Sequence, residues 1–394
     1  MKTAGIICEY NPFHTGHSAH IGKTRSLLGG DCAIVCAMSG NFVQRGDFAV
    51  FNKHARARAA VLCGADLVVE IPSPYSTLSA EGFASAGVYI LDSLGVCSFL
   101  SFGSESGDIG LLEEAAAAIE SEEAKSYLKE WLGKGLPYAS AQQRAADAVM
   151  GKRSGIFRHP NNLLATEYIK ALNKASCVMR PVTVLRTGGI HDGGSGFSAS
   201  ALRKMLLVGE SPWVFMPDEA AAVCKDEIAE GRGPVSMKMA ELAILSRLRA
   251  LKEAEDIQGA SEGLDRRFIR YAASEPTIDL ILSKTKTKRY VMSRLRRMLI
   301  CACLGITAEV TEQPPPYIRV LAMNSRGMEL LKQARKKTRL PVITKPASVH
   351  KLPEHAVRMF EIEATATDLY TLAYPDENKR AGGSEWRQTP FVAT

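Results

Sequence analysis

The chain of 394 residues lacks the features that mark several protein classes. It has nine cysteines but no Cys-x-x-Cys pair. Cys32, Cys36, Cys63 and Cys97 lie in or beside apolar runs, where a reduced cysteine behaves as a small hydrophobic side chain. This usage argues against a disulfide framework and predicts a reducing compartment.

The sequence also lacks a membrane signal. No apolar run approaches the roughly 18–20 residues of a spanning helix, and the first residues carry one lysine, then a glutamate and histidines, unlike a signal peptide. We therefore expect a cytoplasmic protein that has no membrane partner.

The overall composition is that of a soluble globular protein, with 46% hydrophobic and 23% charged residues. The net charge of +7 permits a polyanionic partner without requiring one. At about 150 residues per domain, the length allows two or three domains.

The first half of the chain alternates short apolar runs with helical spacing. The runs predict strands at residues 3–9, 32–38, 65–71, 97–103 and 181–187. They are rich in Val, Ile, Cys and Phe with little polar alternation, which is typical of strands covered on both faces. Helical spacing over 53–64 and 79–95 separates some of them, and the alternation predicts a Rossmann-like parallel sheet.

The pattern changes after residue 205. Helical spacing recurs at 236–257, 264–275 and 288–305. The segment 314–337 combines one strand-like run with a helix, "GRGPVS" at 231–236 is a candidate linker, and the polar tail at 376–390 predicts a loop or a frayed end. We therefore expect an α/β domain over residues 1–230 and a mainly helical, basic region over residues 231–394.

The segment "NPFHTGH" carries the strongest sign of function. It places His14 and His17 between the first predicted strand and a helix that starts at about Ser18. In an open parallel sheet this connection lies at the carboxyl edge, where ligands bind. The helix start offers N–H groups to an anion, and Gly16 lets a phosphate approach the backbone. Both imidazoles could then donate hydrogen bonds to phosphate oxygens.

Two other interpretations of the histidine pair remain open at this point. The histidines could simply cap or pack an ordinary loop. They could also bind zinc, but no third ligand lies nearby at typical spacing, although Glu9 is within reach. We therefore predict no metal site in the protein.

A second motif, "GGSGFSASALRK" at 193–204, follows the last predicted strand. Ser198, Ser200 and Arg203 could form a helix start that faces phosphates. HxGH and [IF]-S-x-[ST]-x-x-R together resemble the nucleotidyltransferase superfamily that shares its fold with class I aminoacyl-tRNA synthetases. Ala199 stands where that motif usually has a serine, which removes one phosphate contact and leaves the arginine.

Longer blocks, in the same order, resemble the bacterial tRNA(Met) cytidine acetate ligase family over about the first 210 residues. They are "GIICEYNPFHTGH", "MSGNFVQRGDFAV", "KHARARAAVLCGADLVVEIP", "FGSESGD", "PNNLLATEYIKAL" and "SASALRK". The resemblance implies an enzyme that activates acetate with ATP to acetyl-adenylate and pyrophosphate, with Mg²⁺ helping on the leaving group. It then implies acetyl transfer to N4 of the wobble cytidine of elongator tRNA(Met).

The resemblance also implies the residues of an ATP site. His14, His17 and Arg203 would be the catalytic groups, and Gly103 would lie under the adenine or ribose. The implied ATP-binding residues are Ile7, Cys8, Glu9, Tyr10, Asn11, Pro12, Phe13, His14, Thr15, Gly16, His17, Ser18, Ala19, His20, Gly103, Asn161 or Asn162, and Arg186.

Basic runs give candidate tRNA contacts. "KTKTKRYVMSRLRR" at 284–297 contains Lys284, Lys286, Lys288, Arg289, Arg294, Arg296 and Arg297 and no acid. On a helix, Arg289, Arg296 and Arg297 would share one face. The side chains expected to pack inward are Val291, Met292, Leu295 and Leu299. "QARKKTR" at 333–339 adds further cations. Such runs are usually solvated, but beside a tRNA-modifying domain they favour phosphate contacts.

Single charges in the N-terminal half have similar alternatives. Lys53, Arg56 and Arg58 could face tRNA, and the alternative for Arg56 and Arg58 is a solvated basic helix face. Asp47 or Glu70 could form structural salt bridges.

Two rival functions remain for the whole chain. One is a nucleotidyltransferase that joins ATP to a small phosphorylated substrate. The other is a nucleotide- or RNA-binding factor without catalysis.

Overall fold

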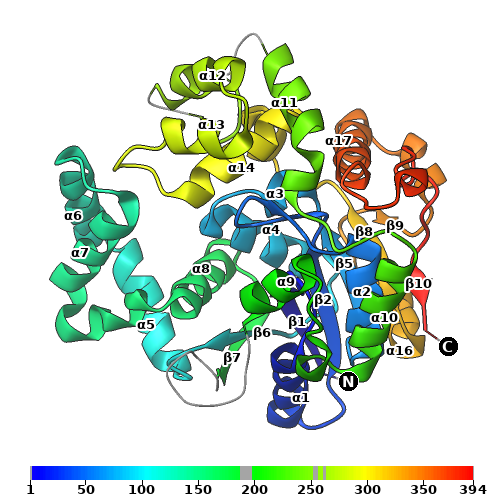
Figure 1. Ribbon diagram of the computed structural model, residues 1–394. Helices are drawn as coiled ribbons and strands as arrows, with labels where there is room; N and C mark the ends of the chain where they lie inside the picture. Colours follow the sequence, from blue (N-terminus) through cyan, green and yellow to red (C-terminus); the bar gives the residue numbers. More distant parts are fainter. Residues whose placement is uncertain (1, 187–197, 252–255, 261–262, 394) are drawn as a thin grey trace.

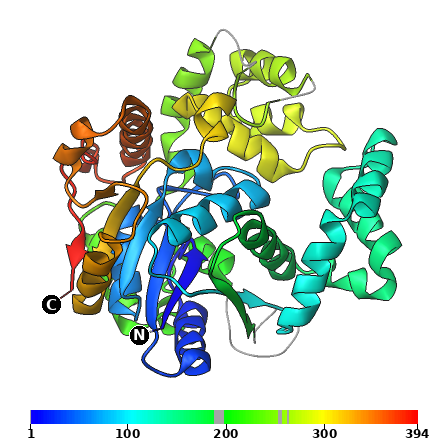
Figure 2. The ribbon, with the colours of Figure 1, turned by 180° about the vertical axis from the view of Figure 1, so that it is seen from behind.

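A central sheet flanked by helices organises the molecule (Figures 1 and 2). The computed structural model describes residues 2–186, 198–251, 256–260 and 263–393. The strand order is β10-β8-β5-β2-β1-β6-β7, with β9 paired to β8. The strands are β1 (Thr3–Cys8), β2 (Ala33–Ser39), β5 (Leu67–Ile71), β6 (Phe99–Ser104), β7 (Arg180–Leu185), β8 (Ile318–Met323), β9 (Val342–Ile343) and β10 (Phe391–Val392).

The five strands from β1 to β7 in this sheet pair in parallel, which confirms the predicted Rossmann-like core. Helices α1 (Thr15–Leu28), α2 (Lys53–Leu62) and α10 (Asp218–Ala229) cover one face. Helices α4 (Ala80–Ser93), α5 (Ile109–Glu120), α8 (Pro160–Lys174) and α16 (Ser325–Ala334) cover the other. The alternation within β1 follows from this arrangement, because Ile6 faces the first layer and Ile7 the second.

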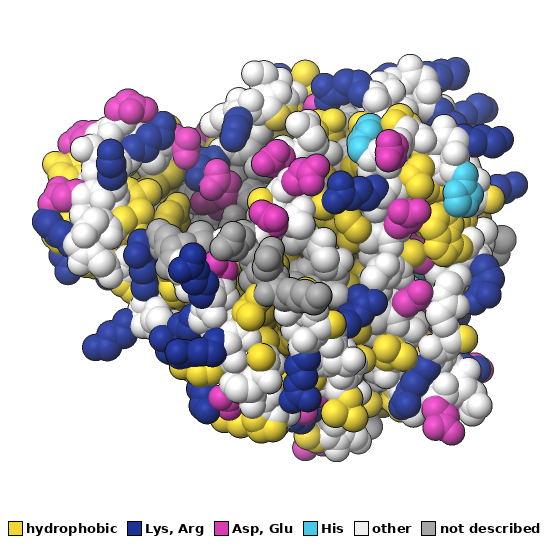
Figure 3. Space-filling model, turned by 90° about the horizontal axis from the view of Figure 1, so that it is seen from above, with side chains coloured by type: hydrophobic (Ala, Val, Ile, Leu, Met, Phe, Trp, Pro, Cys, Tyr) yellow, Lys and Arg dark blue, Asp and Glu magenta, His cyan; other side chains and the backbone are white. Residues whose placement is uncertain are grey.

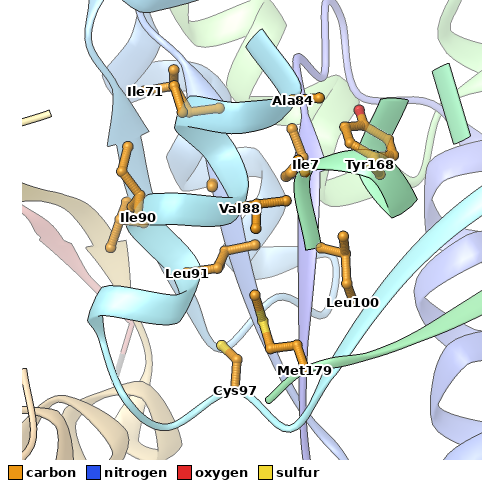
Figure 4. Packing of buried hydrophobic residues seen from close by; sticks show 14 of the residues in the cluster. Ile7, Ile71, Ala84, Val88, Ile90, Leu91, Cys97, Leu100, Tyr168 and Met179 are labelled. Atoms are coloured by element: carbon orange, nitrogen blue, oxygen red, sulfur yellow. The ribbon is translucent and has the colours of Figure 1, made fainter. Parts of the chain in front are cut away.

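Close packing of α4 against β1 depends on small residues. In Figure 4, Ile7, Val88 and Leu91 lie in one apolar cluster with Leu100 of β6. A Cβ on Gly5 of β1 would lie only 2.6 Å from the Cδ1 atom of Leu91. The glycine therefore lets α4 approach the strand that precedes the HxGH loop.

One predicted helix boundary is wrong, and one further helical stretch contains two helices. The stretch 110–136 forms two helices, α5 and α6 (Glu122–Gly133), because Ser121 ends the first and caps the second by accepting a hydrogen bond from the Ala124 N–H (3.1 Å). The stretch 288–305 becomes helical only at Met292, so Arg289 precedes helix α14 (Met292–Leu304).

The C-terminal part contains a second, helical core. It comprises α11 (Glu241–Ala250), α12 (Leu264–Ser274), α13 (Ile278–Thr285), α14 and the end of α17 (Glu354–Thr371). Phe42 and Phe48 of the hairpin formed by β3 (Phe42–Val43) and β4 (Asp47–Phe48) are buried in the same core. No helix within the described ranges is long and apolar enough to cross a membrane.

The remaining helical elements connect these layers or extend from them. They are α3 (Ser73–Ser76), α7 (Tyr138–Met150), α9 (Ala199–Leu207), α15 (Ala308–Glu312) and the 3₁₀ segments η1 (Gly151–Arg158), η2 (Trp213–Phe215), η3 (Met237–Ala240), η4 (Pro346–Lys351) and η5 (Glu377–Lys379).

The central sheet contains strands from both sides of the expected domain division at residue 230. Strand β8 pairs antiparallel with β5, and β10 pairs with β8, so residues beyond 230 extend the N-terminal sheet. The tail at 376–390 is largely loop, as predicted, but it is not frayed, because Glu385 is 1% exposed and the tail is followed by β10. The division into residues 1–230 and 231–394 stays a prediction, and the central sheet draws strands from both sides of it.

A buried ion cluster joins the two parts of the chain. Nζ of Lys53 on α2 lies 2.7 Å from Oε1 of Glu70, 2.9 Å from Oε1 of Glu363 and 2.8 Å from Oε2 of Glu385, all fully buried. Burial alone would lower the pKa of Lys53, but the three carboxylates outweigh it and raise the pKa. Lys53 was a candidate for tRNA contact in the sequence, and this burial excludes that role.

We expect Lys53→Met to lower the free energy of unfolding by about 3–5 kcal/mol, because it leaves buried carboxylates without their cation. Urea unfolding measures this change. The control is Arg153→Gln, which breaks the exposed pair with Glu114 and should cost less than about 1 kcal/mol. Equal effects of the two substitutions would contradict a structural role for the cluster.

Candidate nucleotide site

The HxGH loop lies where the order of the sheet reverses. Strand β1 has β2 on one side and β6 on the other, so the chain leaves β1 at the switch point of the doubly wound sheet. Residues 9–14 form the connection and α1 begins at Thr15. The predicted order of strand, loop and helix is confirmed, but the helix starts at Thr15 instead of Ser18, so His14 is its N-cap and His17 lies in its first turn.

The two histidines form a capping box at the start of α1. Nδ1 of His14 accepts a hydrogen bond from the Gly16 N–H (3.0 Å), and Nδ1 of His17 accepts one from the His14 N–H (3.2 Å). Their rings stack with centroids 3.8 Å apart. Because both Nδ1 atoms accept, each neutral ring carries its proton on Nε2 and can donate it to a ligand.

Gly16 keeps this geometry possible. A Cβ at this position would lie 2.9 Å from the Cε1 atom of His14 and would displace the ring. The absence of a side chain at Gly16 thus leaves room for the His14 ring. It also leaves room for an anion near the backbone, as the sequence suggested. His20, one turn further on, has its Nε2 atom 3.1 Å from the Ser101 hydroxyl of β6.

Burial lowers the pKa of all three histidines. The pKa of His14 and that of His20 both fall to about 4, chiefly through desolvation and then through the charge of Arg186. The pKa of His17 falls well below its usual value for the same first reason, with His14 contributing next. At neutral pH the site therefore presents uncharged imidazoles.

Arg56 of α2 holds the HxGH loop from behind. Its guanidinium donates to the carbonyl oxygens of Glu9, Ser39, Gly40 and Phe51. The side chain is 2% exposed, so neither tRNA contact nor a solvated basic face, the two alternatives from the sequence, describes it. A carbonyl-binding role of this kind has no local sequence signature, because three of the four acceptors lie 16 to 47 positions away in the chain.

Further contacts fix the loop on its other side. The Oδ1 atom of Asn11 accepts from the Val50 N–H (2.8 Å), and Oε1 of Glu9 accepts from the Gln44 N–H (2.8 Å). Nη1 of Arg203 donates to the Asn11 carbonyl (2.7 Å). The second motif thus contacts the HxGH loop, and the phosphate contact predicted for Arg203 stays a prediction.

The start of that second motif is only partly described. Ser198 caps α9 by accepting from the Ala201 N–H (3.3 Å), whereas residues 193–197 lie outside the described residues. The hydroxyl of Ser198 is therefore used by the helix itself.

Gly103 and Arg186 meet at the ends of β6 and β7. A Cβ on Gly103 would lie 3.0 Å from Cγ of Arg186, so the arginine side chain covers the glycine. The Arg186 N–H donates to the Ser104 carbonyl (2.9 Å). The structure therefore brings these two candidate residues together.

Asn162 and Asn161 both belong to a turn built around Glu105. Asn162 is buried, and its Oδ1 atom accepts from the N–H groups of Glu105 (2.9 Å) and Ser106 (3.1 Å). Nδ2 of Asn161 donates to Oε1 of Glu105 (2.6 Å). Both asparagines thus shape the loop after β6, and Asn161 is the more accessible of the two.

The other candidate residues divide by exposure. Ile7, Tyr10 and Phe13 are buried in the two sheet cores, so their side chains serve packing. Near the start of α1, Thr15 and Ala19 are exposed. The remaining candidates are the buried Pro12 and the half-buried Cys8 and Ser18.

The charge run at 284–297 is only partly available to a partner. Arg297 donates to the Gln44 carbonyl (3.4 Å) and Arg296 pairs with Asp47 (3.4 Å), which confirms the structural salt bridge predicted for Asp47. Val291 is 51% exposed, so its predicted inward packing is wrong. Lys286 and Lys288 precede α14 and are exposed.

The second run lies elsewhere on the molecule. Arg339 pairs with Asp92 at the end of α4, and Lys337 contacts Gly95. This position is at the amino edge of the sheet, opposite the HxGH loop. Because they lie at opposite edges of the sheet, the two basic runs do not form one continuous surface. In the view of Figure 3, Lys and Arg side chains are interspersed with Asp and Glu.

Within the described ranges, no group of three or more His, Cys, Asp or Glu residues is arranged to hold a metal ion. The HxGH loop instead gathers a helix N-terminus, two Nε2–H donors and the arginines 186 and 203 at one edge of a doubly wound sheet. These are the elements of a phosphate-binding α/β fold of the nucleotidyltransferase type.

Comparison with known proteins supports the assignment to the nucleotidyltransferase type. A model described as HIGH Nucleotidyl Transferase matches residues 1–385. The tRNA(Met) cytidine acetate ligase of Caldicellulosiruptor saccharolyticus is 40% identical over 395 aligned residues, covering 96% of each chain. The protein of the same name from Caldanaerobacter subterraneus is 39% identical, covering 95% of this chain and 96% of that protein.

A solved structure shows the same fold. Thermotoga maritima TmcAL bound with alpha-thio ATP superposes with a TM-score of 0.91 at 33% identity, covering 100% of this chain and 99% of that one. The chain therefore belongs to the HIGH nucleotidyl transferase family. Within it, the chain falls among the tRNA(Met) cytidine acetate ligases.

Lowering the pH should destabilise the protein through these buried histidines. A histidine whose pKa is about 6.5 unfolded and about 4 folded takes up its proton in the unfolded state first, so stability falls as pH drops from 6.5 towards 4. For His20 the loss at pH 5 is at most about 2 kcal/mol. Unfolding titrations at pH 7 and pH 5 should show a smaller difference for His20→Gln than for the wild type.

The control for this titration is His355→Gln, at an exposed position on α17. It should keep the pH dependence of the wild type. An unchanged dependence in His20→Gln as well would show that His20 does not contribute.

Proposed function

We propose that the chain is an ATP-dependent ligase that acetylates N4 of the wobble cytidine of elongator tRNA(Met). The observation that carries the proposal is the HxGH capping box at the switch point of the sheet, in a chain about 40% identical to tRNA(Met) cytidine acetate ligases along nearly its whole length. The reaction proceeds in two steps, adenylation of acetate and acetyl transfer.

In the first step, a carboxylate oxygen of acetate attacks the α-phosphorus of ATP. A new O–P bond forms, the bond to the bridging oxygen of the β-phosphate breaks, and pyrophosphate leaves. Nε2–H of His14 and of His17 and the N-terminus of α1 donate to the phosphate oxygens as negative charge grows there. Arg203, already fixed on the Asn11 carbonyl, and Arg186 add positive charge.

The uncharged state of the imidazoles suits this role. Their proton stays on Nε2 because the backbone occupies Nδ1, so the donor direction is set before ATP binds. Acetate is small and offers little binding energy, so the ATP site must supply most of the positioning. Mg²⁺ would arrive on the phosphates of ATP and stabilise the leaving pyrophosphate.

In the second step, the N4 amine of cytidine attacks the acetyl carbonyl, an N–C bond forms, and AMP leaves with the bonding electrons while the amine loses a proton. For this the cytidine must be splayed out towards the HxGH loop. Phosphate contacts from the exposed lysines before α14 would hold the tRNA, because α14 packs on the hairpin that binds Glu9.

The two rival functions predict different products. Incubation with ATP, labelled acetate and unmodified tRNA(Met) should release pyrophosphate and label the tRNA. Turnover with a small phosphorylated substrate in place of acetate would indicate another nucleotidyltransferase. Binding of ATP or RNA without turnover would indicate a non-catalytic factor.

His14→Asn should separate the two roles of His14. Asparagine is a good N-cap and can still accept from the α1 backbone, but it cannot supply the Nε2–H donor at the same place. We expect acetate-dependent pyrophosphate release to fall by about 10²–10³-fold, with thermal stability nearly unchanged. The control, His355→Asn, should keep full activity, and equal activity of the two variants would remove His14 from the mechanism.

Replacing Lys286 and Lys288 by Gln should weaken tRNA binding and lower the salt dependence of log K by about one unit per lost phosphate contact. ATP-dependent adenylation of acetate should not change. The control pair, Lys336→Gln with Lys337→Gln, lies on the basic run at the opposite edge of the sheet and should leave tRNA affinity intact. If only the control pair reduces affinity, the tRNA surface lies there instead.

A further inference from the structure

The tip of the β3–β4 hairpin lies between the HxGH loop and helix α14. The Gly46 N–H donates to the Val43 carbonyl (2.8 Å), so the tip is a tight turn with Arg45 at its third position. A Cβ on Gly46 would lie 2.6 Å from the carbonyl carbon of Arg296 on α14. The turn therefore packs directly on the backbone of α14.

Hydrogen bonds hold the same turn on its other side. The Gln44 N–H donates to Oε1 of Glu9 (2.8 Å), and Nε2 of Gln44 donates to the Leu78 carbonyl (3.3 Å). The Gln44 carbonyl accepts from Nη1 of Arg297 (3.4 Å). Because Glu9 directly follows β1, the backbone at the next position of the hairpin is fixed beside the start of the HxGH loop.

The side chain of Arg45 is free although its backbone is fixed. It is exposed, and among the described residues it has no hydrogen bond, ion pair or ring contact. Burial lowers the pKa of Arg203, Glu9 and Asp47 oppose this, and the charge of Arg45 lowers the pKa further. Since charges act on one another in this way only at short range, the two guanidinium groups lie near each other.

Positive charge is in excess around this tip. The charged side chains there include Arg45, Arg203, Arg296, Arg297, Glu9 and Asp47. Both carboxylates already have partners, because Glu9 binds the Gln44 N–H and Asp47 pairs with Arg296 (3.4 Å). An anion that reaches the tip therefore meets a guanidinium without a competing carboxylate, and the fork of N–H donors on a guanidinium matches the oxygens of a phosphate.

Both substrates of the proposed reaction bring phosphates to this edge of the sheet. We propose that Arg45 is a further phosphate-binding residue, which holds a phosphate on the side of the nucleotide site that faces α14. This role rests on the proposed function, and ATP and tRNA share the chemistry. On ATP, the guanidinium would stabilise the charge of the leaving pyrophosphate. On tRNA, it would hold the backbone beside the splayed cytidine.

Arg45→Gln removes this charge and should leave the melting temperature unchanged, because the side chain is exposed. Two assays distinguish the sources of the phosphate. In acetate-dependent exchange of labelled pyrophosphate into ATP, without tRNA, kcat/KM for ATP should fall about tenfold or more if Arg45 binds ATP. If it binds tRNA, this exchange should not change. In the transfer of labelled acetate to tRNA(Met), KM for tRNA should then rise about fivefold or more, and the salt slope should fall by about one.

Two further variants serve as controls. Arg335→Gln removes another exposed arginine, beside Lys337 at the opposite edge of the sheet, and should behave as the wild type in both assays. Arg45→Lys keeps the charge without the guanidinium fork and should recover part of the loss. A phosphate-binding role for Arg45 is overturned if Arg45→Gln matches the wild type in both assays, or if Arg335→Gln loses as much. A wild type that neither exchanges pyrophosphate nor labels tRNA would instead overturn the proposed function.

Discussion

Lys53 carries a positive charge into the interior of the molecule, and three carboxylates from β5, α17 and the tail meet it there. The cluster lies beside Gly40, where an added Cβ would be 2.8 Å from Oε1 of Glu70. Since Arg56, one turn along α2, binds the Gly40 and Glu9 carbonyls, the cluster and the HxGH loop share one support. The HxGH loop thus depends on buried charges that lie outside it.

This support fixes the donors that we propose for the phosphates of ATP. The backbone fixes both imidazoles through Nδ1, burial keeps them neutral, and the loop that carries them is bound on three sides by Arg56, Val50 and Arg203. Donors held in place before the ligand arrives need little reorganisation when charge develops. The hairpin from β3 to β4 links the same loop to the helical core through Gln44 and Arg297.

The sequence was informative where the pattern is local. Alternating apolar runs identified the parallel strands, and HxGH identified the start of α1, because strand spacing, capping and helix starts involve neighbouring residues. The sequence could not place β8 beside β5 or Glu385 beside Lys53, since those contacts join distant segments. For the same reason, charge alone did not separate the buried Arg56 from the exposed Lys286.

The long separation between Lys53 and its acids has a consequence for biosynthesis. Lys53 and Glu363 are 310 positions apart in the chain. A ribosome makes α2 and β5 long before it makes α17 and the tail, so the nascent N-terminal half holds a lysine and one carboxylate of an unfinished cluster. Strand β5 likewise has an open edge until β8 is made. Helix α17 and Glu385, which are made later, thus complete the buried cluster beside the HxGH loop, and until then the exposed strand edge of the N-terminal half is prone to aggregation.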